Sequence, residues 1–325
     1  MYDYGLSVLP RYALTCSSSA RVRGALLCDT DKGLKIISEF GGANAKLEQQ
    51  YLFQQQITAS GILRCDQVLR NEEGELVTVG EDGIPYIVRE WCPGRECDTR
   101  NKDEIIRAAR ALARLHTIIH LPVKEEYVKE SLVQECTRHN AEIRKIRKYL
   151  LKKKKRNEFE TLLLSCAEPY LAQGEEMVEH LCRSSYEQLR VQAITRGSIC
   201  HGEYNQHNIL LDGVKAEMIV NFEKWDFDLP TADLYHFMRK ILEKHNWDRH
   251  TADLLLNAYN AVRPLGVEEL QDLKLRISYP WKYWKIANHY YGSSKAWISS
   301  KNTEKLRQLN AQKEDWINFI KNVDF

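Results

Sequence analysis

The spacing of hydrophobic residues changes near residue 100 of this chain, and that change limits the folds open to it. Before this point, short β-rich runs alternate with turns rich in glycine and aspartate, a pattern typical of antiparallel hairpins. These runs are residues 25–28, 34–37, 75–79 and 86–88. One helix, predicted to start with Asn44 as its N-cap, interrupts them. From about residue 101, apolar residues recur with the spacing of amphipathic helices, so the sequence predicts a small antiparallel sheet followed by a large helical region.

Length and composition narrow the class of protein further. A chain of 325 residues, 43% of them hydrophobic, is long enough to form two lobes around a large core. The net charge of +2 gives no general reason to expect nucleic-acid or membrane binding. The nine cysteines include no CxxC pair, so neither a disulfide framework nor a zinc site is expected. The sequence shows no signal peptide and no membrane-spanning segment, which predicts a protein of the cytoplasm.

A late β signal and a polar run occur together inside the helical region. Residues 209–211 and 218–220 flank Asp212-Gly213, a pair suited to hairpin turns. Directly before them stands His201-Gly202-Glu203-Tyr204-Asn205-Gln206-His207-Asn208, and Asn221-Phe222-Glu223 begins thirteen residues after Asn208. This arrangement resembles the H-G-D-x-x-x-x-N catalytic loop of aminoglycoside phosphotransferases, with its metal-binding segment one hairpin later.

The resemblance implies a fold and its division. The expected fold is α+β and bilobal, of the protein-kinase-like, aminoglycoside phosphotransferase type. The implied parts are an N-lobe at residues 1–93 and a helical C-lobe at 94–325, with a catalytic-loop region at 201–223 and a helical insertion at 121–192.

The resemblance also assigns catalytic and metal-binding roles. In phosphoryl transfer, a carboxylate orients the attacking hydroxyl, and metal ions neutralise the phosphates. Glu203 and Asn208 would be the catalytic residues, and Asn208, Asn221 and Glu223 would hold the metal. Asp233 would anchor the catalytic loop, as an equivalent aspartate does in related kinases.

Four further residues would bind the nucleotide. A strand lysine paired with a helix glutamate grips the phosphates in this superfamily. Lys35 and Glu48 suit these roles by their order and spacing. Glu90 and Cys92, where the last predicted strand runs into the hinge, would lie against adenine. The implied cofactor is ATP or GTP with Mg²⁺.

Several stretches are similar to a narrower group, the CotS family of kinase-like spore-coat proteins. They are residues 91–98, 203–208, 233–240 and 279–288. The last resembles a Y-P-E-K-x-W-K-I-x-N element of that family, with Trp281 in place of the glutamate. The resemblance implies a spore-forming bacterium and a role in coat assembly, in the mother-cell cytoplasm and the spore coat. Spore-coat proteins or a small-molecule substrate would be the partners.

Two of the expected carboxylates are altered. Glu203 replaces an aspartate, and a misplacement of about 1 Å can cost on the order of a hundredfold in rate. Asn221 replaces the metal-holding aspartate, and a neutral amide is a poorer ligand for a hard cation. Glu223, Asp226 and Asp228 could compensate, or they could be ordinary loop acids.

Two functions follow from these substitutions. The first is a spore-coat-associated, kinase-like protein with impaired catalysis that binds a nucleotide, a small molecule or a coat protein. The alternative is an active ATP-dependent phosphotransferase acting on a small hydroxylated substrate or a protein. The basic run at residues 144–156 could bind an anionic partner or be a solvated helix end. Because it contains few aromatic residues, nucleic acid is the least expected partner.

Overall fold

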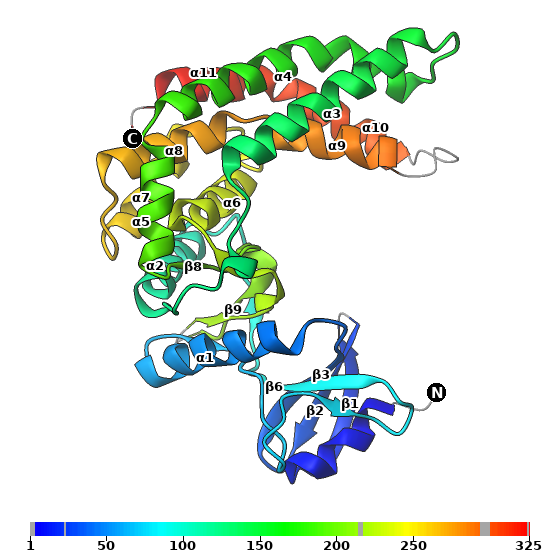
Figure 1. Ribbon diagram of the computed structural model, residues 1–325, viewed down its shortest axis with the longest axis vertical. Helices are drawn as coiled ribbons and strands as arrows, with labels where there is room; N and C mark the ends of the chain where they lie inside the picture. Colours follow the sequence, from blue (N-terminus) through cyan, green and yellow to red (C-terminus); the bar gives the residue numbers. More distant parts are fainter. Residues whose placement is uncertain (1–3, 23, 214–216, 293–299, 324) are drawn as a thin grey trace.

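The computed structural model describes residues 4–22, 24–213, 217–292, 300–323 and 325. Residues 1–3, which contributed to the expectation of no signal peptide, lie outside this part. Figure 1 shows a small lobe built around a sheet, and a larger lobe made mainly of helices. The two-lobed α+β architecture predicted from the sequence is therefore present.

The N-lobe is built on a five-stranded antiparallel sheet in the order β1-β2-β3-β6-β5. The strands are β1 (Cys16–Val22), β2 (Ala25–Thr30), β3 (Gly33–Glu39), β6 (Pro85–Glu90) and β5 (Thr78–Val79). Because side chains alternate between the two faces of a strand, the sheet has two different surroundings. One face, with Ile37 and Val88, packs on the 3-10 helix η1 (Tyr4–Tyr12). The other, with Ile87, packs on α1 (Asn44–Ser60).

The helix α1 contacts both lobes. Its N-cap is Ala43, which makes no side-chain capping bond, so the prediction that Asn44 caps the helix is wrong by one residue. The Phe53 ring centroid lies 5.4 Å from those of Phe222 and Trp225, both in the C-lobe. The side chain of Gln56 makes two hydrogen bonds, of 2.8 and 3.0 Å, with the backbone that follows α2. α1 is thus fixed to the C-lobe as well as to the sheet.

A second sheet joins the lobes in the order β4-β10-β9-β7. Its strands are β4 (Arg64–Cys65), β10 (Met218–Ile219), β9 (Ile209–Leu211) and β7 (Arg95–Glu96). β9 and β10 pair antiparallel, which confirms the predicted late hairpin. β4 follows α1 in the chain and pairs parallel with β10. The segment after α1 is therefore tied to the hairpin that follows the catalytic loop.

The C-lobe is mainly helical. Its α-helices are α2 (Lys102–Ile118), α3 (Leu132–Lys152), α4 (Glu158–Arg183), α5 (Tyr186–Thr195), α6 (Pro230–Leu242), α7 (Arg249–Asn260), α8 (Val267–Ser278), α9 (Trp281–Gly292), α10 (Ser300–Ala311) and α11 (Lys313–Asn322). Short elements are η2 (Glu125–Tyr127), η3 (Gln206–Asn208), η4 (Phe222–Lys224), β8 (Ile199–Cys200) and β11 (Asp226–Phe227). α3 and α4 pack on each other and form an arm that projects beyond the lobe in Figure 1. None of the described helices combines the length and apolarity needed to cross a bilayer.

Candidate active site

The catalytic loop is held from below by Asp233 of α6. The buried carboxylate accepts the backbone N–H of His201 at 2.5 Å and of Gly202 at 3.0 Å. His116 Nε2 lies 3.3 Å from the same carboxylate. Burial opposes ionisation, but these partners outweigh it and hold the pKa of Asp233 below its usual range. The predicted role of Asp233 as the anchor of the loop is confirmed.

Gly202 allows the loop to turn against η4. Its φ is +76°, and an added Cβ would lie 2.0 Å from the carbonyl oxygen of Lys224. The neighbouring His201 ring links the loop to the following strand, because Nε2 lies 2.9 Å from the carbonyl oxygen of Val220. His201 Nδ1 accepts the backbone N–H of Glu203 at 3.2 Å. These contacts fix the backbone from which Glu203 projects.

Asn208 and Asn221 are hydrogen-bonded to each other through their side chains. Asn208 Nδ2 donates to the carbonyl oxygen of Glu203 at 3.0 Å, which leaves Asn208 Oδ1 facing Asn221. Asn221 Nδ2 donates to that oxygen at 2.8 Å. Asn221 has φ +66° and ψ +59°, a left-handed conformation that asparagine adopts more readily than most residues. The structure thus brings together two of the three residues predicted to hold a metal.

The bond between these two amides bears directly on metal binding. An aspartate at position 221 would place a second oxygen against Asn208 Oδ1, and the two oxygens would repel unless a cation lay between them. The amide nitrogen of Asn221 removes that repulsion and also one negative charge. Asn208 and Asn221 therefore do not fit Mg²⁺ as an asparagine–aspartate pair would.

The remaining acids near the loop differ in their surroundings. Glu203 and Glu223 are exposed, and within the described part of the chain neither carboxylate forms an ion pair. Asp226 lies 3.7 Å from Lys129 Nζ, and Asp228 is buried and accepts the backbone N–H of the next residue at 2.7 Å. Burial and the neighbouring Asp228 raise the pKa of Asp226 well above its usual range. The two aspartates belong to the packed C-lobe, so the interpretation as ordinary loop acids does not describe them.

The predicted pair of Lys35 and Glu48 is not formed. Lys35 lies opposite Cys28 in the sheet and so shares the face covered by η1, whereas α1 packs on the other face. Its Nζ lies 3.1 Å from Glu90 Oε2. Glu48 pairs instead with Arg70, with 2.6 Å between the charged atoms. The expectation failed because Lys35 points away from the helix that carries Glu48.

Glu90 and Cys92 lie where the chain passes between the lobes. The backbone N–H of Glu90 donates to the carbonyl oxygen of Gln67 at 2.8 Å, and the backbone N–H of Trp91 donates to the carbonyl oxygen of Leu34 at 3.1 Å. Trp91 and Cys92 pack against buried apolar side chains of the late hairpin, namely Leu210, Met218 and Val220. A contact of this segment with adenine stays a prediction.

A buried ion pair that the sequence did not indicate lies beside these residues. Arg89 of β6 pairs with Ile36 in the sheet register and therefore points to the α1 face, as Ser38 does. Arg89 Nη1 lies 2.8 Å from Asp66 Oδ2, and the two side chains are 5% and 0% exposed. The same oxygen of Asp66 accepts the backbone N–H of Asn221 at 3.0 Å. A charged residue at the end of a strand is usually solvated, so no sequence signal marked this pair.

Asp66 makes the stability of the chain depend on pH. Burial raises the pKa of its carboxyl from 3.8 to about 6, with Arg89 and the N–H of Asn221 opposing the rise and Glu223 adding to it. Because the folded state holds this proton more tightly than the unfolded state, the free energy of unfolding falls as pH rises from about 4 to about 6. The stability of the native chain relative to Asp66→Asn is expected to fall by about 3 kcal/mol over this range. Urea denaturation of both proteins at each pH measures the difference, and a constant or growing value would contradict the assignment.

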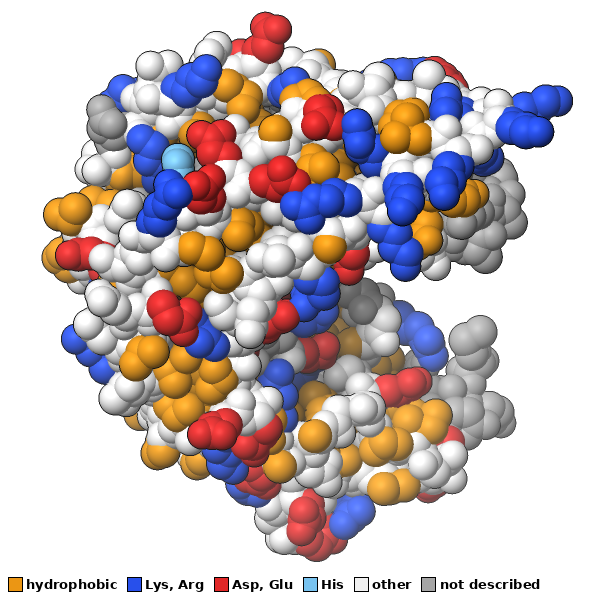
Figure 2. Space-filling view, turned by 45° about the horizontal axis from the view of Figure 1, so that its top comes forward, with side chains coloured by type: hydrophobic (Ala, Val, Ile, Leu, Met, Phe, Trp, Pro, Cys, Tyr) orange, Lys and Arg blue, Asp and Glu red, His pale blue; other side chains and the backbone are white. Residues whose placement is uncertain are grey.

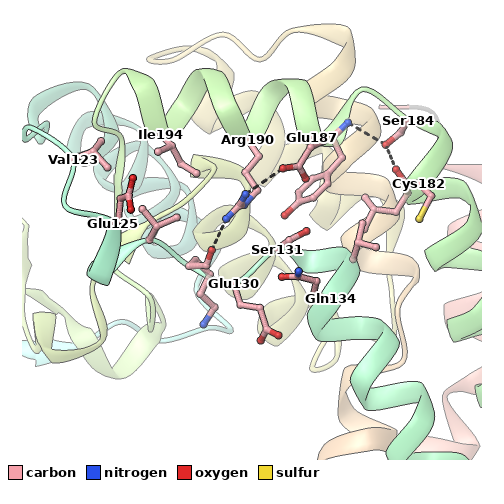
Figure 3. Close-up of a pocket in the computed structure, with 15 residues that line it drawn as sticks. Val123, Glu125, Glu130, Ser131, Gln134, Cys182, Ser184, Glu187, Arg190 and Ile194 are labelled. Carbon is pink, nitrogen blue, oxygen red and sulfur yellow. Dashed lines mark hydrogen bonds and ion pairs between the residues drawn. The ribbon is translucent and has the colours of Figure 1, made fainter.

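A surface hollow of about 900 Å³ lies elsewhere on the C-lobe, where residues 123–134 meet residues 181–194. Figure 3 shows Arg190 reaching across it from α5. Arg190 donates to Glu187 Oε1 at 3.2 Å and to the carbonyl oxygen of Lys129 at 2.7 Å. None of the predicted site residues lines this hollow, so it is separate from the predicted catalytic site.

The basic run at residues 144–156 lies at the end of the arm, where Figure 2 shows lysine and arginine side chains gathered. Three of its members pair with acids of α4: Arg144 with Glu175, Arg147 with Glu168 and Lys153 with Glu160. Five lysines are exposed and form no ion pair within the described residues: Lys145, Lys148, Lys152, Lys154 and Lys155. The paired members stabilise the arm, and the exposed ones leave a local positive surface.

Comparison with solved structures identifies the fold. The chain superposes on an aminoglycoside phosphotransferase from Alicyclobacillus acidocaldarius with a TM-score of 0.86 and 18% identity, covering 96% of this chain and 93% of that one. A spectinomycin phosphotransferase in complex with ADP and spectinomycin gives a TM-score of 0.61 at 12% identity, covering 97% and 95%. At these identities the likeness shows the fold alone. The predicted bilobal, protein-kinase-like fold of the aminoglycoside phosphotransferase type is confirmed.

The family follows from the sequence itself. The family model described as "Spore coat putative kinase YutH" matches residues 7–323, so the chain belongs to that family. Spore coat protein S of Bacillus subtilis (strain 168) is 26% identical over 165 residues, which are 50% of this chain and 46% of the relative. Endospore coat-associated protein YutH of the same strain is 28% identical over 129 residues, 39% of this chain and 36% of the relative. The matches span less than half the length of these relatives, and they confirm the predicted likeness to CotS-type spore-coat proteins.

Proposed function

We propose that this chain is a spore-coat-associated, kinase-like protein whose cleft binds a ligand and transfers phosphoryl groups slowly or not at all. The observation that carries the proposal is the hydrogen bond from Asn221 Nδ2 to Asn208 Oδ1, at 2.8 Å. In a working kinase the residues at these two positions would hold a metal ion that neutralises phosphate charge, whereas here their side chains bond to each other. The longer side chain of Glu203 adds to the impairment.

The family description and the names of both relatives support a place in the spore coat. Synthesis in the mother-cell cytoplasm is part of the same proposal. The cleft between the lobes, visible as a hollow in Figure 2, would hold ATP or GTP, another small molecule or part of a coat protein. The fold supports nucleotide binding, because a structure of the same fold is a complex with ADP.

The alternative is an active phosphotransferase for a small hydroxylated substrate or a protein. The exposure of Glu203 and Glu223 favours it, because both carboxylates are open to a substrate or a metal. Glu203 would then orient the acceptor hydroxyl, and Glu223 would supply the charge missing at Asn221.

Thermal unfolding with nucleotides separates the two functions. ATP or GTP near a hundredfold excess over Kd is expected to stabilise the native chain by about 2.7 kcal/mol. The rise in Tm is expected to be the same with EDTA as with Mg²⁺ or Mn²⁺, because the metal position is closed by the two asparagines. A rise that requires metal would favour the active phosphotransferase. No rise with any nucleotide would leave a coat protein or a different small molecule as the ligand.

A further inference from the structure

The α1 face of the N-lobe sheet has a cation, but not the one expected from the family. In this superfamily a strand lysine faces the helix and grips phosphates. Lys35 is on the opposite face, and the β3 residues directed toward α1 are Ile36 and Ser38. The guanidinium of Arg89, on the neighbouring strand β6, lies on the α1 face and donates through Nη2 to Ser38 Oγ at 3.3 Å. Arg89 therefore places a positive charge beside the position from which a β3 lysine would reach.

This guanidinium is close to the altered metal site. Arg89 Nη1 and the backbone N–H of Asn221 share one acceptor, Asp66 Oδ2, at 2.8 and 3.0 Å. Asn221 in turn bonds to Asn208. The guanidinium thus lies two hydrogen bonds from the backbone of the residue that replaces the metal-holding aspartate.

The Arg89–Asp66 pair has unused hydrogen-bonding capacity. Arg89 Nε and Asp66 Oδ1 are buried and have no hydrogen-bond partner within the described part of the chain. A buried polar atom without a partner costs about 1–3 kcal/mol. An arginine fork matches the geometry of a phosphate and can donate through Nε and Nη together.

We propose that Arg89 is the phosphate-binding cation of this cleft, holding a nucleotide phosphate without Mg²⁺ and with Asp66 as its partner in the ligand-free state. The inference rests on the proposed function, because it takes the ligand to be a nucleotide. It explains how a site that lacks both a lysine on this face and a metal-binding aspartate could still hold an anionic group. One positive charge on Arg89 would offset phosphate charge that Lys and Mg²⁺ offset in a working kinase.

Calorimetric titration with ADP and with adenosine, both in EDTA, and with ADP in Mg²⁺, tests the proposal. The variant is Arg89→Met combined with Asp66→Asn, so that no buried carboxylate is left without its cation. We expect at least about a tenfold loss of ADP affinity in this variant, because charge-assisted bonds to the phosphate are removed. Adenosine, which has no phosphate, is expected to bind both proteins equally. Arg11→Met is the matched control, since it removes another ion-paired N-lobe arginine, which lies on η1, 3.0 Å from Glu73.

The outcomes distinguish this inference from the proposed function. Equal ADP affinity in the native chain and the double variant would overturn the role of Arg89 and leave the proposed function standing. An equal loss for adenosine and ADP would also overturn it, because the cleft itself would then have changed. ADP binding that appears only with Mg²⁺ would overturn both, since the metal site would be working. Failure of the native chain to bind ADP either in EDTA or with Mg²⁺ would overturn the inference alone.

Discussion

Replacing Glu203 and Asn221 together by aspartate is expected to raise the rate of γ-phosphoryl transfer from ATP by at least about a hundredfold. The change at position 203 would return the carboxylate to the shorter reach of the family motif. The change at position 221 would place an oxygen against Asn208 Oδ1 in place of the present N–H, whose nitrogen is 2.8 Å away, and would create a site for Mg²⁺. ADP formation from ATP and Mg²⁺, with water as the acceptor, measures the rate without a known substrate.

The control for this reversion carries the same chemical changes at exposed helical positions. Glu168→Asp and Asn257→Asp alter α4 and α7, away from the catalytic loop, and are expected to leave ADP formation unchanged. Each single reversion at positions 203 and 221 should give less than the pair, because transfer needs both the base and the metal. No gain in the double variant over the native chain would contradict the assignment of the impairment to these two residues.

Replacing Arg89 by methionine is expected to lower the free energy of unfolding by about 3–5 kcal/mol at pH 7.5. The reason is that Asp66, whose side chain is fully buried, would keep a carboxylate without a cation. Methionine fills much of the volume of the arginine stem, so loss of packing is a smaller part of the effect. Urea denaturation followed by circular dichroism measures the change.

The double variant Arg89→Met with Asp66→Asn shows whether the loss comes from an uncompensated charge. The asparagine oxygen can still accept the N–H of Asn221, and no buried charge remains. Most of the stability lost in the single variant is therefore expected to return. A double variant as unstable as Arg89→Met would instead assign the effect to packing, and a single variant that costs under about 1 kcal/mol would show that the pair is not buried in solution.

The catalytic loop could be predicted because its determinants are local. The spacing from His201 to Asn208, the glycine at 202 and the hairpin that follows are all short-range features, and Asp233 completes them by binding two backbone N–H groups. The sequence also shows that Asn221 stands where the family motif has an aspartate. The bond from Asn221 to Asn208 is not visible in the sequence, because it depends on how the hairpin folds back on the loop.

The N-lobe could not be predicted to the same depth, because side-chain direction changes with every residue of a strand. Lys35 and Ser38 are three positions apart and so lie on opposite faces of β3, and only the sheet register shows which face meets α1. Composition and order predicted β2, β3, β5 and β6, but neither β1 nor this parity. The partner of Arg89 was hidden for a further reason, since Asp66 is 23 residues away in the segment after α1.

The central claim is that the cleft binds a ligand but transfers phosphoryl groups slowly or not at all. A single-turnover measurement of ATP consumption by the native chain tests this claim most directly. Protein in excess over radiolabelled ATP is incubated with Mg²⁺ at a concentration at which binding is saturated. We predict that label is released no faster than in a matched solution without protein, while the Glu203→Asp, Asn221→Asp variant releases it. Mg²⁺-dependent release by the native chain that is lost on chelation would contradict this claim and establish an active phosphotransferase.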